Sequence, residues 1–67
     1  MIILTGLNGI PFALNSNLIE TMYQIPETKI SLTNGKYFLV KETQEEVIQK
    51  IVDYNRSIFR DAIKLSK

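Results

Sequence analysis

The dipeptide Asn-Gly occurs twice in this chain, at positions 8–9 and 34–35, each time between short apolar segments. Asn and Gly tolerate the positive φ angles that tight strand reversals need, so the dipeptide in this setting indicates a β-hairpin. The same order of residue types surrounds both copies, in IILTGLNGIPFAL and in ISLTNGKYFLV. The sequence therefore predicts two hairpins, which reflect either a pseudo-repeat or the limited vocabulary of good hairpins.

The glycines of these segments have one alternative interpretation, which is a phosphate-binding loop. Such a loop needs a strand, a glycine-rich turn and then a helix whose N-terminus meets the anion. A further strand pattern follows both Asn-Gly pairs in place of a helix. Gly6, Gly9 and Gly35 are therefore interpreted as hairpin glycines.

Strand patterns occupy most of the first 41 residues. They fall at residues 2–5, 10–14, 18–25, 29–33 and 36–41. The alternation of the third segment is imperfect, so it is either a strand throughout or begins with a brief helical turn. Pro11 has no amide hydrogen to donate, which places its strand at a sheet edge or a bulge. Pro26 suits the second position of a type I turn.

The alternation of apolar residues also assigns inward faces to these strands. On the second strand, Ile10, Phe12 and Leu14 are expected on one face. In the second hairpin, one inward face is expected from Ile30, Leu32, Tyr37 and Leu39.

A helix is predicted to begin at Thr43, where Thr43-Gln-Glu-Glu46 fits a capping box. Acidic residues gather near this end and basic residues near the C-terminal end, which complements the helix dipole. The sequence thus predicts an α+β fold in a single domain of residues 1–67. Residues 1–41 form a small antiparallel sheet of four to five short strands, and one long C-terminal amphipathic helix covers residues 43–65.

The predicted helix is longer than the sheet can cover. Residues 44–65 would span about 33 Å as a helix, whereas strands of about five residues cover only about 17 Å. The first half is expected to pack on the sheet through Val47, Ile48, Ile51 and Val52. The second half stays apolar, and exposed apolar surface of this kind marks an interface. The hypothesised interface residues are Asn55, Ile58, Phe59, Ala62, Ile63 and Leu65.

One set of helix positions keeps heptad spacing, with Asn55 as its single polar member. The set consists of Ile48, Ile51, Asn55, Ile58, Ala62 and Leu65. An Asn at such a position can fix register and oligomer state, so a homo-oligomer is predicted. The alternative is that Asn55 faces solvent and that the second half of the helix packs on irregular chain nearby.

Three basic residues form a stripe beside this apolar face. They lie four apart, at Arg56, Arg60 and Lys64. The stripe has two possible roles. It is a surface that binds anionic lipid or an acidic partner, or it is a solvated face that complements the helix dipole. Because it is short and weakly basic, membrane contact is expected to be peripheral at most.

The chain contains no Cys and no His. Disulfides and ordinary zinc sites are therefore excluded as supports for so small a domain, and oligomerisation remains. Thiol chemistry and a His general base are excluded as well. We therefore predict no enzyme, no catalytic residue, no metal, no cofactor and no small-molecule substrate. The acids expected on the water-facing side of the helix are Glu42, Glu45, Glu46, Asp53 and Asp61.

The net charge of +1 gives no strong field that would attract nucleic acid. No apolar run approaches the roughly 18–20 residues of a membrane span, and the N-terminus lacks the layout of a signal peptide. A soluble cytoplasmic protein is the resulting expectation.

Several short motifs follow one another along the chain. They are IILTxLNG at the start, Phe12-Ala13-Leu14-Asn15, Leu18-Ile19-Glu20, Pro26-Glu27-Thr28, Ile30-Ser31-Leu32-Thr33-Asn34-Gly35-Lys36, Val40-Lys41-Glu42 and Glu46-Val47-Ile48. In this order they resemble the FlbD/SwrD-type family of flagellar, swarming-motility proteins over nearly the whole chain. The sequence departs from that family at Gly6, where a basic residue is expected, and in a longer apolar segment past Asn55.

The resemblance implies a cytoplasmic accessory protein of the bacterial flagellum without enzymatic activity, at the inner face of the membrane near the motor. It would support swarming by helping the motor to deliver torque. Its partner would be a flagellar motor or basal-body protein. As a separate hypothesis, Ile58, Phe59, Ala62 and Ile63 of the helix contact either a second copy of the chain or a motor component.

A second and superficial similarity is to the carbon-storage-regulator type of RNA-binding translational repressor, in which short strands also precede one helix. In that family basic residues follow the first strand and gather near the helix start. Here those places hold Gly6-Leu7 and Glu45-Glu46, and the carboxylates would repel phosphate. Three aromatic residues could stack on bases: Tyr23, Tyr37 and Phe38. Aromatic residues in strands, however, more often belong to the core.

Overall fold

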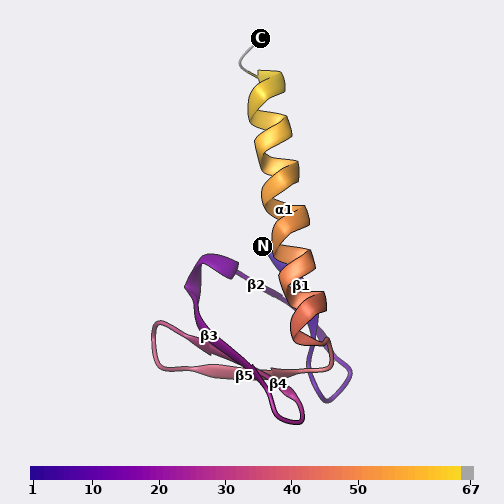
Figure 1. The fold of residues 1–67 in the computed structure, drawn as a ribbon, viewed down its shortest axis with the longest axis vertical. Helices are drawn as coiled ribbons and strands as arrows, with labels where there is room; N and C mark the ends of the chain where they lie inside the picture. Colours follow the sequence, from indigo (N-terminus) through magenta and orange to yellow (C-terminus); the bar gives the residue numbers. More distant parts are fainter. Residues whose placement is uncertain (66–67) are drawn as a thin grey trace.

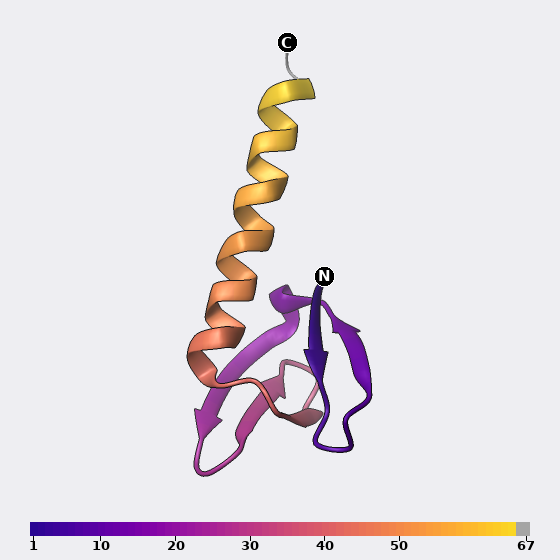
Figure 2. The same cartoon turned by 90° about the vertical axis from the view of Figure 1, so that its right-hand side faces the viewer.

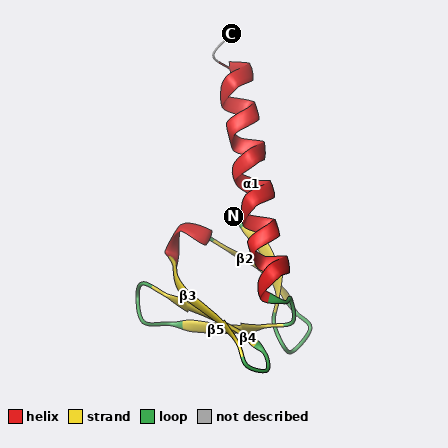
Figure 3. Cartoon of the chain, viewed as in Figure 1, coloured by secondary structure: helices red, strands yellow, loops and turns green. Residues whose placement is uncertain are grey.

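The computed structural model describes residues 1–65, and within them the side chains of residues 1–58. Five short strands precede a single long helix (Figures 1 and 3), so the predicted α+β class is confirmed. The elements are β1 (Ile2–Thr5), β2 (Pro11–Leu14), the 3₁₀ helix η1 (Ser16–Leu18), β3 (Ile19–Gln24), β4 (Thr28–Leu32), β5 (Tyr37–Val40) and α1 (Gln44–Leu65).

The strands form two small antiparallel sheets where one had been predicted. One contains β1 and β2, and the other contains β3, β4 and β5 in that order. A single bridge between Gly6 and Val40 joins them, next to a hydrogen bond of 2.8 Å from the Lys41 amide to the Thr5 carbonyl oxygen. Pairing stops there because the chain turns back on itself directly after Gly6, so β1 cannot continue along β5.

Both hairpins close in the same way. The Gly6 amide donates to the Ile10 carbonyl at 3.0 Å, and the Leu32 amide donates to the Lys36 carbonyl at 2.8 Å. Gly9 and Gly35 have φ angles of 84° and 86°, whereas no other residue type has a positive φ among the described residues. Each loop is therefore a three-residue connection ending in a left-handed glycine. The Asn before each glycine has a negative φ, although the sequence allows a positive φ for Asn as well as for Gly.

The asparagines contribute through their side chains. The Asn8 Oδ1 accepts from the Ile10 amide at 2.9 Å, and the Asn34 Oδ1 accepts from the Lys36 amide at 3.0 Å. A short polar side chain that bonds the backbone two residues on mimics a backbone turn. Both halves of the Asn-Gly signal thus have a physical role, since Asn holds the loop and Gly supplies the left-handed φ.

The likeness of the two hairpins extends to burial. Leu4 and Ile30 occupy equivalent positions and are both fully buried, at 0% exposure. Leu14 and Val40, the last residues of the two hairpins, are buried as well. The register agrees too, because Leu4 faces Phe12 just as Ile30 faces Phe38. The repeated sequence is therefore a repeated structure, as the pseudo-repeat interpretation requires.

The segment between the hairpins begins with a brief helical turn and continues as a strand, which is the second of the two predicted alternatives. Residues Ser16–Leu18 form a 3₁₀ turn, and the Asn15 side chain accepts from the Asn17 amide at 3.0 Å. Strand β3 follows directly and has an irregularity between Ile19 and Thr21. At its far end the chain reverses through a bend at residues 25–27, which contains a cis Ile25-Pro26 bond, where a type I turn is predicted.

The core lies between the hairpins and the start of α1. Its buried hydrophobic members are Ile2, Leu4, Leu14, Ile30, Leu32, Val40 and Val47. The predicted inward face of β5 is wrong, because Tyr37 and Leu39 are exposed whereas Phe38 and Val40 lie opposite residues of the inward face of β4. All four residues of β5 are apolar or aromatic, so its pattern did not fix the face. Ile10 is also exposed, since it precedes β2 in the loop.

Helix α1 packs on the sheet only through its first turns. Val47 is fully buried and Ile51 packs against the core, as two residues four apart on one face should. Ile48 and Val52 are 45% and 41% exposed, so the expectation that they also pack on the sheet is wrong. The helix contacts β1 of one sheet and β3 of the other, and Val47 and Ile51 are its described residues at the core.

Beyond these turns the helix projects away from the strands (Figures 1 and 2). Every residue from 52 to 58 is exposed. The molecule is accordingly elongated, with extents of 45 × 23 × 19 Å. Over the described residues, the helix is not apolar enough along its length to cross a membrane.

Candidate interaction surfaces

The start of α1 is tied to the sheet by Glu42. Its carboxylate accepts from the Thr5 amide at 2.9 and 3.1 Å and from the Thr5 hydroxyl at 2.9 Å. Its carbonyl oxygen accepts from the hydroxyl of Thr28, a residue that is only 2% exposed. One residue thus bonds the end of β1 and the start of β4, one strand from each hairpin, and fixes where the helix leaves the sheet.

This arrangement lowers the pKa of Glu42. Partial burial alone would raise the pKa, but the hydrogen bonds from the Thr5 amide and hydroxyl outweigh it, with help from the Glu42 amide and the positive charge of Lys50. Glu42 had been expected on the water-facing side of the helix, and that expectation is wrong. It precedes α1, and its partner Thr5 lies far away in sequence, so no local pattern could reveal the contact.

The predicted capping box is confirmed. The Glu46 amide donates to the Thr43 hydroxyl at 3.1 Å, and the Thr43 amide donates to the Glu46 carboxylate at 3.0 Å. A further hydrogen bond of 2.6 Å runs from the Gln44 amide to the Gln24 side chain on β3. Three amides at the helix start therefore have partners, and the direction of α1 is set by the sheet.

The first candidate surface is the part of α1 that extends past the sheet, which we call the helix overhang (residues 52–58 as described). Of the residues hypothesised for an interface, Asn55 and Ile58 lie here and are exposed, Ile58 at 50%. Arg56 of the basic stripe is exposed as well. The other hypothesised side chains fall outside the described side chains: Phe59, Arg60, Ala62, Ile63, Lys64 and Leu65.

The residues with heptad spacing do not form a continuous exposed stripe along the helix. Ile51 packs against the core, whereas Ile48 and Ile58 are exposed on the same helix. A helix docking along α1 would therefore meet the sheet near Ile51. Ile48 and the positions from 52 to 58 are therefore exposed on either side of Ile51.

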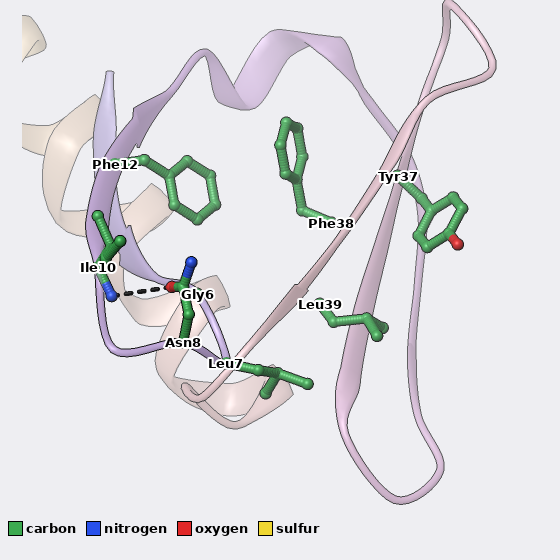
Figure 4. Close-up of a pocket in the computed structure, with 8 residues that line it drawn as sticks. All are labelled: Gly6, Leu7, Asn8, Ile10, Phe12, Tyr37, Phe38 and Leu39. Atoms are coloured by element: carbon green, nitrogen blue, oxygen red, sulfur yellow. Dashed lines mark hydrogen bonds between the residues drawn. The ribbon is translucent and has the colours of Figure 1, made fainter.

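The second candidate surface was not found from the sequence. It is an open groove of about 540 Å³ between the first hairpin loop and β5 (Figure 4). We call it the hairpin groove. Its lining carries no charged residue and consists of Gly6, Leu7, Asn8, Ile10, Phe12, Tyr37, Phe38 and Leu39. Phe12 and Phe38, equivalent residues of the two repeats, face each other in it with ring centroids 5.0 Å apart.

The sequence did contain a signal for this groove. Phe12 and Phe38 follow the two Asn-Gly pairs at the same spacing. Side chains at equivalent positions of two packed repeats meet when the repeats face each other, as these two rings do. The alternation of apolar residues predicts Ile10, Tyr37 and Leu39 on inward faces, whereas all three are exposed.

Two lysines flank the hairpin groove. The Lys29 Nζ lies 4.5 Å from the centroid of the Tyr37 ring, within the range of a cation–π contact. At the other end, the Lys41 Nζ lies 3.8 Å from the place that a Cβ on Gly9 would take. The lining of the groove is therefore uncharged, with one positive charge beside Tyr37 and another beside the first hairpin loop.

Gly6, where the resemblance leads one to expect a basic residue, forms part of the groove wall. A Cβ added there would come 2.9 Å from the Asn8 Oδ1, which already accepts from the Ile10 amide. A larger residue would thus displace the Asn8 side chain and reshape the loop. The glycine allows the loop to close tightly beside β5.

Comparison with known proteins adds one finding. A family model described as flagellar and swarming motility proteins, FlbD, matches residues 1–59. The match covers all five strands and most of α1. No curated protein sequence and no solved structure matches the chain. The match gives no support to the alternative of an RNA-binding regulator.

Proposed function

The chain belongs to the FlbD family of flagellar and swarming motility proteins, and on this premise we propose that it is a non-enzymatic accessory of the bacterial flagellum. It supports swarming by helping the motor to deliver torque, and it acts through contacts with other proteins. The family membership supports the motility role, and the surface of α1 supports the mode of action.

The observation that carries the proposal is the helix overhang. A small domain gains little by extending several helical turns past its core, since isolated helical turns are marginal in water. Here the overhang keeps exposed apolar residues, Val52 at 41% and Ile58 at 50%. Such surface is typical of a contact that is completed by a partner. The partner is a protein of the flagellar motor or basal body.

The place of action follows from the partner. The protein works in the cytoplasm at the inner face of the membrane, beside the motor. Arg56, which is exposed on the overhang, supports a contact with an acidic surface there. A homo-oligomer through the same helix would compete with this contact, so the two must be distinguished by experiment.

The proposal is tested by placing a charge on the overhang. Ile58→Asp is expected to reduce swarming strongly and to lower the torque of single motors under high load, while the protein level stays normal. Ile25→Asp is the matched control, because Ile25 is an apolar residue at 87% exposure that belongs neither to α1 nor to the hairpin groove. Normal swarming and torque in the Ile58 variant would refute the proposed contact.

A further inference from the structure

We infer that the hairpin groove is a docking site for an extended protein segment with alternating apolar residues and acidic residues at its ends. The site lies on the sheet, and the inference does not depend on the helix contact proposed above. Three observations carry it: an open strand edge, an apolar floor, and two lysines, one beside Tyr37 and one beside the first hairpin loop.

The open edge belongs to β5. The Leu32 amide bonds the Lys36 carbonyl, and Ile30 and Phe38 are opposite each other in the register of β4 and β5. Backbone groups in an antiparallel strand alternate in direction. Tyr37 and Leu39 therefore direct their backbone groups away from β4, toward the groove.

Part of this edge of β5 already pairs with the first hairpin. The Lys41 amide, next in this alternation, donates to the Thr5 carbonyl at 2.8 Å, and Gly6 forms a bridge with Val40. The first hairpin then turns away, which leaves the rest of β5 beside the groove. A partner strand in the groove would continue the pairing that β1 begins, as in recognition by strand addition.

The floor offers places for apolar side chains. Phe12 and Phe38 lie at its centre, and Ile10 at 63% exposure stands at its border. A volume of about 540 Å³ is within the range of sites that bind compact apolar groups. Alternate residues of an extended segment point to one side, so two of them can reach the floor while the backbone follows β5.

The lysines beside the groove determine which charged residues a bound segment should carry. Lys29 and Lys41 flank the groove, and no lining residue is charged. Glu42, the acid that follows Lys41, is turned to Thr5 and does not neutralise this end. Electrostatic complementarity therefore favours Asp or Glu on both sides of the apolar residues.

A single-stranded nucleic acid is disfavoured by the rings themselves. Bases stack on free aromatic faces, but Phe12 and Phe38 lie against each other, tilted by 32°. One face of the Tyr37 ring is in contact with the Lys29 ammonium. The contact between the two Phe rings and the Lys29 contact thus each take up an aromatic face on which a base could stack.

The test uses a phage-displayed library of random octapeptides, selected on the full-length chain. The enriched peptides are expected to alternate apolar residues and to carry Asp or Glu at the ends. A fluorescent synthetic copy of the consensus is then titrated by polarisation. Ile10→Asp should weaken its binding by about tenfold or more, since it places a like charge beside the acidic segment. Ile25→Asp, at an exposed apolar site outside the groove, should bind like the unaltered chain.

Two further measurements sharpen the result. The double variant Lys29→Glu and Lys41→Glu should weaken the same peptide, and methylation of peptide amides that face β5 should do so too. Circular dichroism checks that each variant is folded. The inference is overturned by the absence of any enriched peptide, by enriched peptides with basic ends, or by equal binding to the Ile10 and Ile25 variants. Displacement of the peptide by single-stranded RNA at equal concentration would overturn it as well.

Discussion

The two hairpins have nearly the same local structure but different neighbours. Gly9 and Gly35 have the same left-handed conformation, and Asn8 and Asn34 hold their loops with the same hydrogen bond. In the second hairpin, β4 is paired on both sides, by β3 and β5. In the first, β1 is paired by β2 alone apart from the single bridge to Val40.

The difference shows what local sequence decides and what it leaves to the rest of the chain. Turn chemistry sets each hairpin, whereas its position in the sheet decides which edges stay open. At Ser31 the outward backbone groups meet β3, but at the equivalent Thr5 they meet Lys41 and the Glu42 carboxylate. The helix start therefore stands where the first hairpin lacks a third strand, and the groove opens beside it.

The largest effect is expected where the two repeats are most alike. Leu4→Ala and Ile30→Ala each remove a side chain at 0% exposure, so each should lower the free energy of unfolding by about 2–5 kcal/mol. Urea denaturation followed by circular dichroism measures both. A loss under about 1 kcal/mol at either site would show that the two repeats do not share one core.

The loop glycines should give the next largest effect, and an equal one. Gly9→Ala and Gly35→Ala force a side chain into a left-handed conformation, which costs about 1–2 kcal/mol. A Cβ has room at both sites, since it would meet only the Lys41 Nζ at 3.8 Å at Gly9 and nothing within 4 Å at Gly35. Clearly unequal losses in thermal or urea unfolding would break the equivalence of the loops.

Glu42 supplies a pH-dependent difference between the hairpins. Its folded-state pKa lies below the ordinary value of 4.5, so it contributes stability above that value and loses it as pH falls through the folded pKa. Glu42→Gln should therefore destabilise the protein at pH 7 by about 1 kcal/mol, the scale of a solvent-accessible hydrogen bond. The deficit should shrink below pH 4, and a deficit that is constant from pH 7 to pH 3 would contradict this assignment.

The smallest change in stability is expected on the helix overhang. Ile58→Asp alters a side chain that is half exposed, so its free energy of unfolding should stay within about 0.5 kcal/mol of that of the unaltered chain. Val47→Ala, on the part of α1 that packs on the sheet, should be clearly destabilised in the same assay. Similar losses at both positions would mean that the overhang has a packing role within the chain.

Sequence patterns predicted the features that depend on neighbouring residues. The Asn-Gly loops and the capping box at Thr43 are examples, because their hydrogen bonds join residues two to four positions apart. The predicted inward face of β5 was wrong, because a strand in which every residue is apolar or aromatic has no alternation that shows which side chains point inward. The Glu42–Thr5 contact and the hairpin groove depend on how distant segments meet, so they became visible only in the fold.

The most direct test of the proposed function is a photo-crosslink from position 58 in living cells. A photoreactive amino acid replaces Ile58 on the overhang, with position 25 as the control, and captured proteins are identified by mass spectrometry. The account predicts capture of a flagellar motor or basal-body protein from position 58 and not from position 25. Capture of a second copy alone, or of no flagellar protein at normal protein levels, would contradict it.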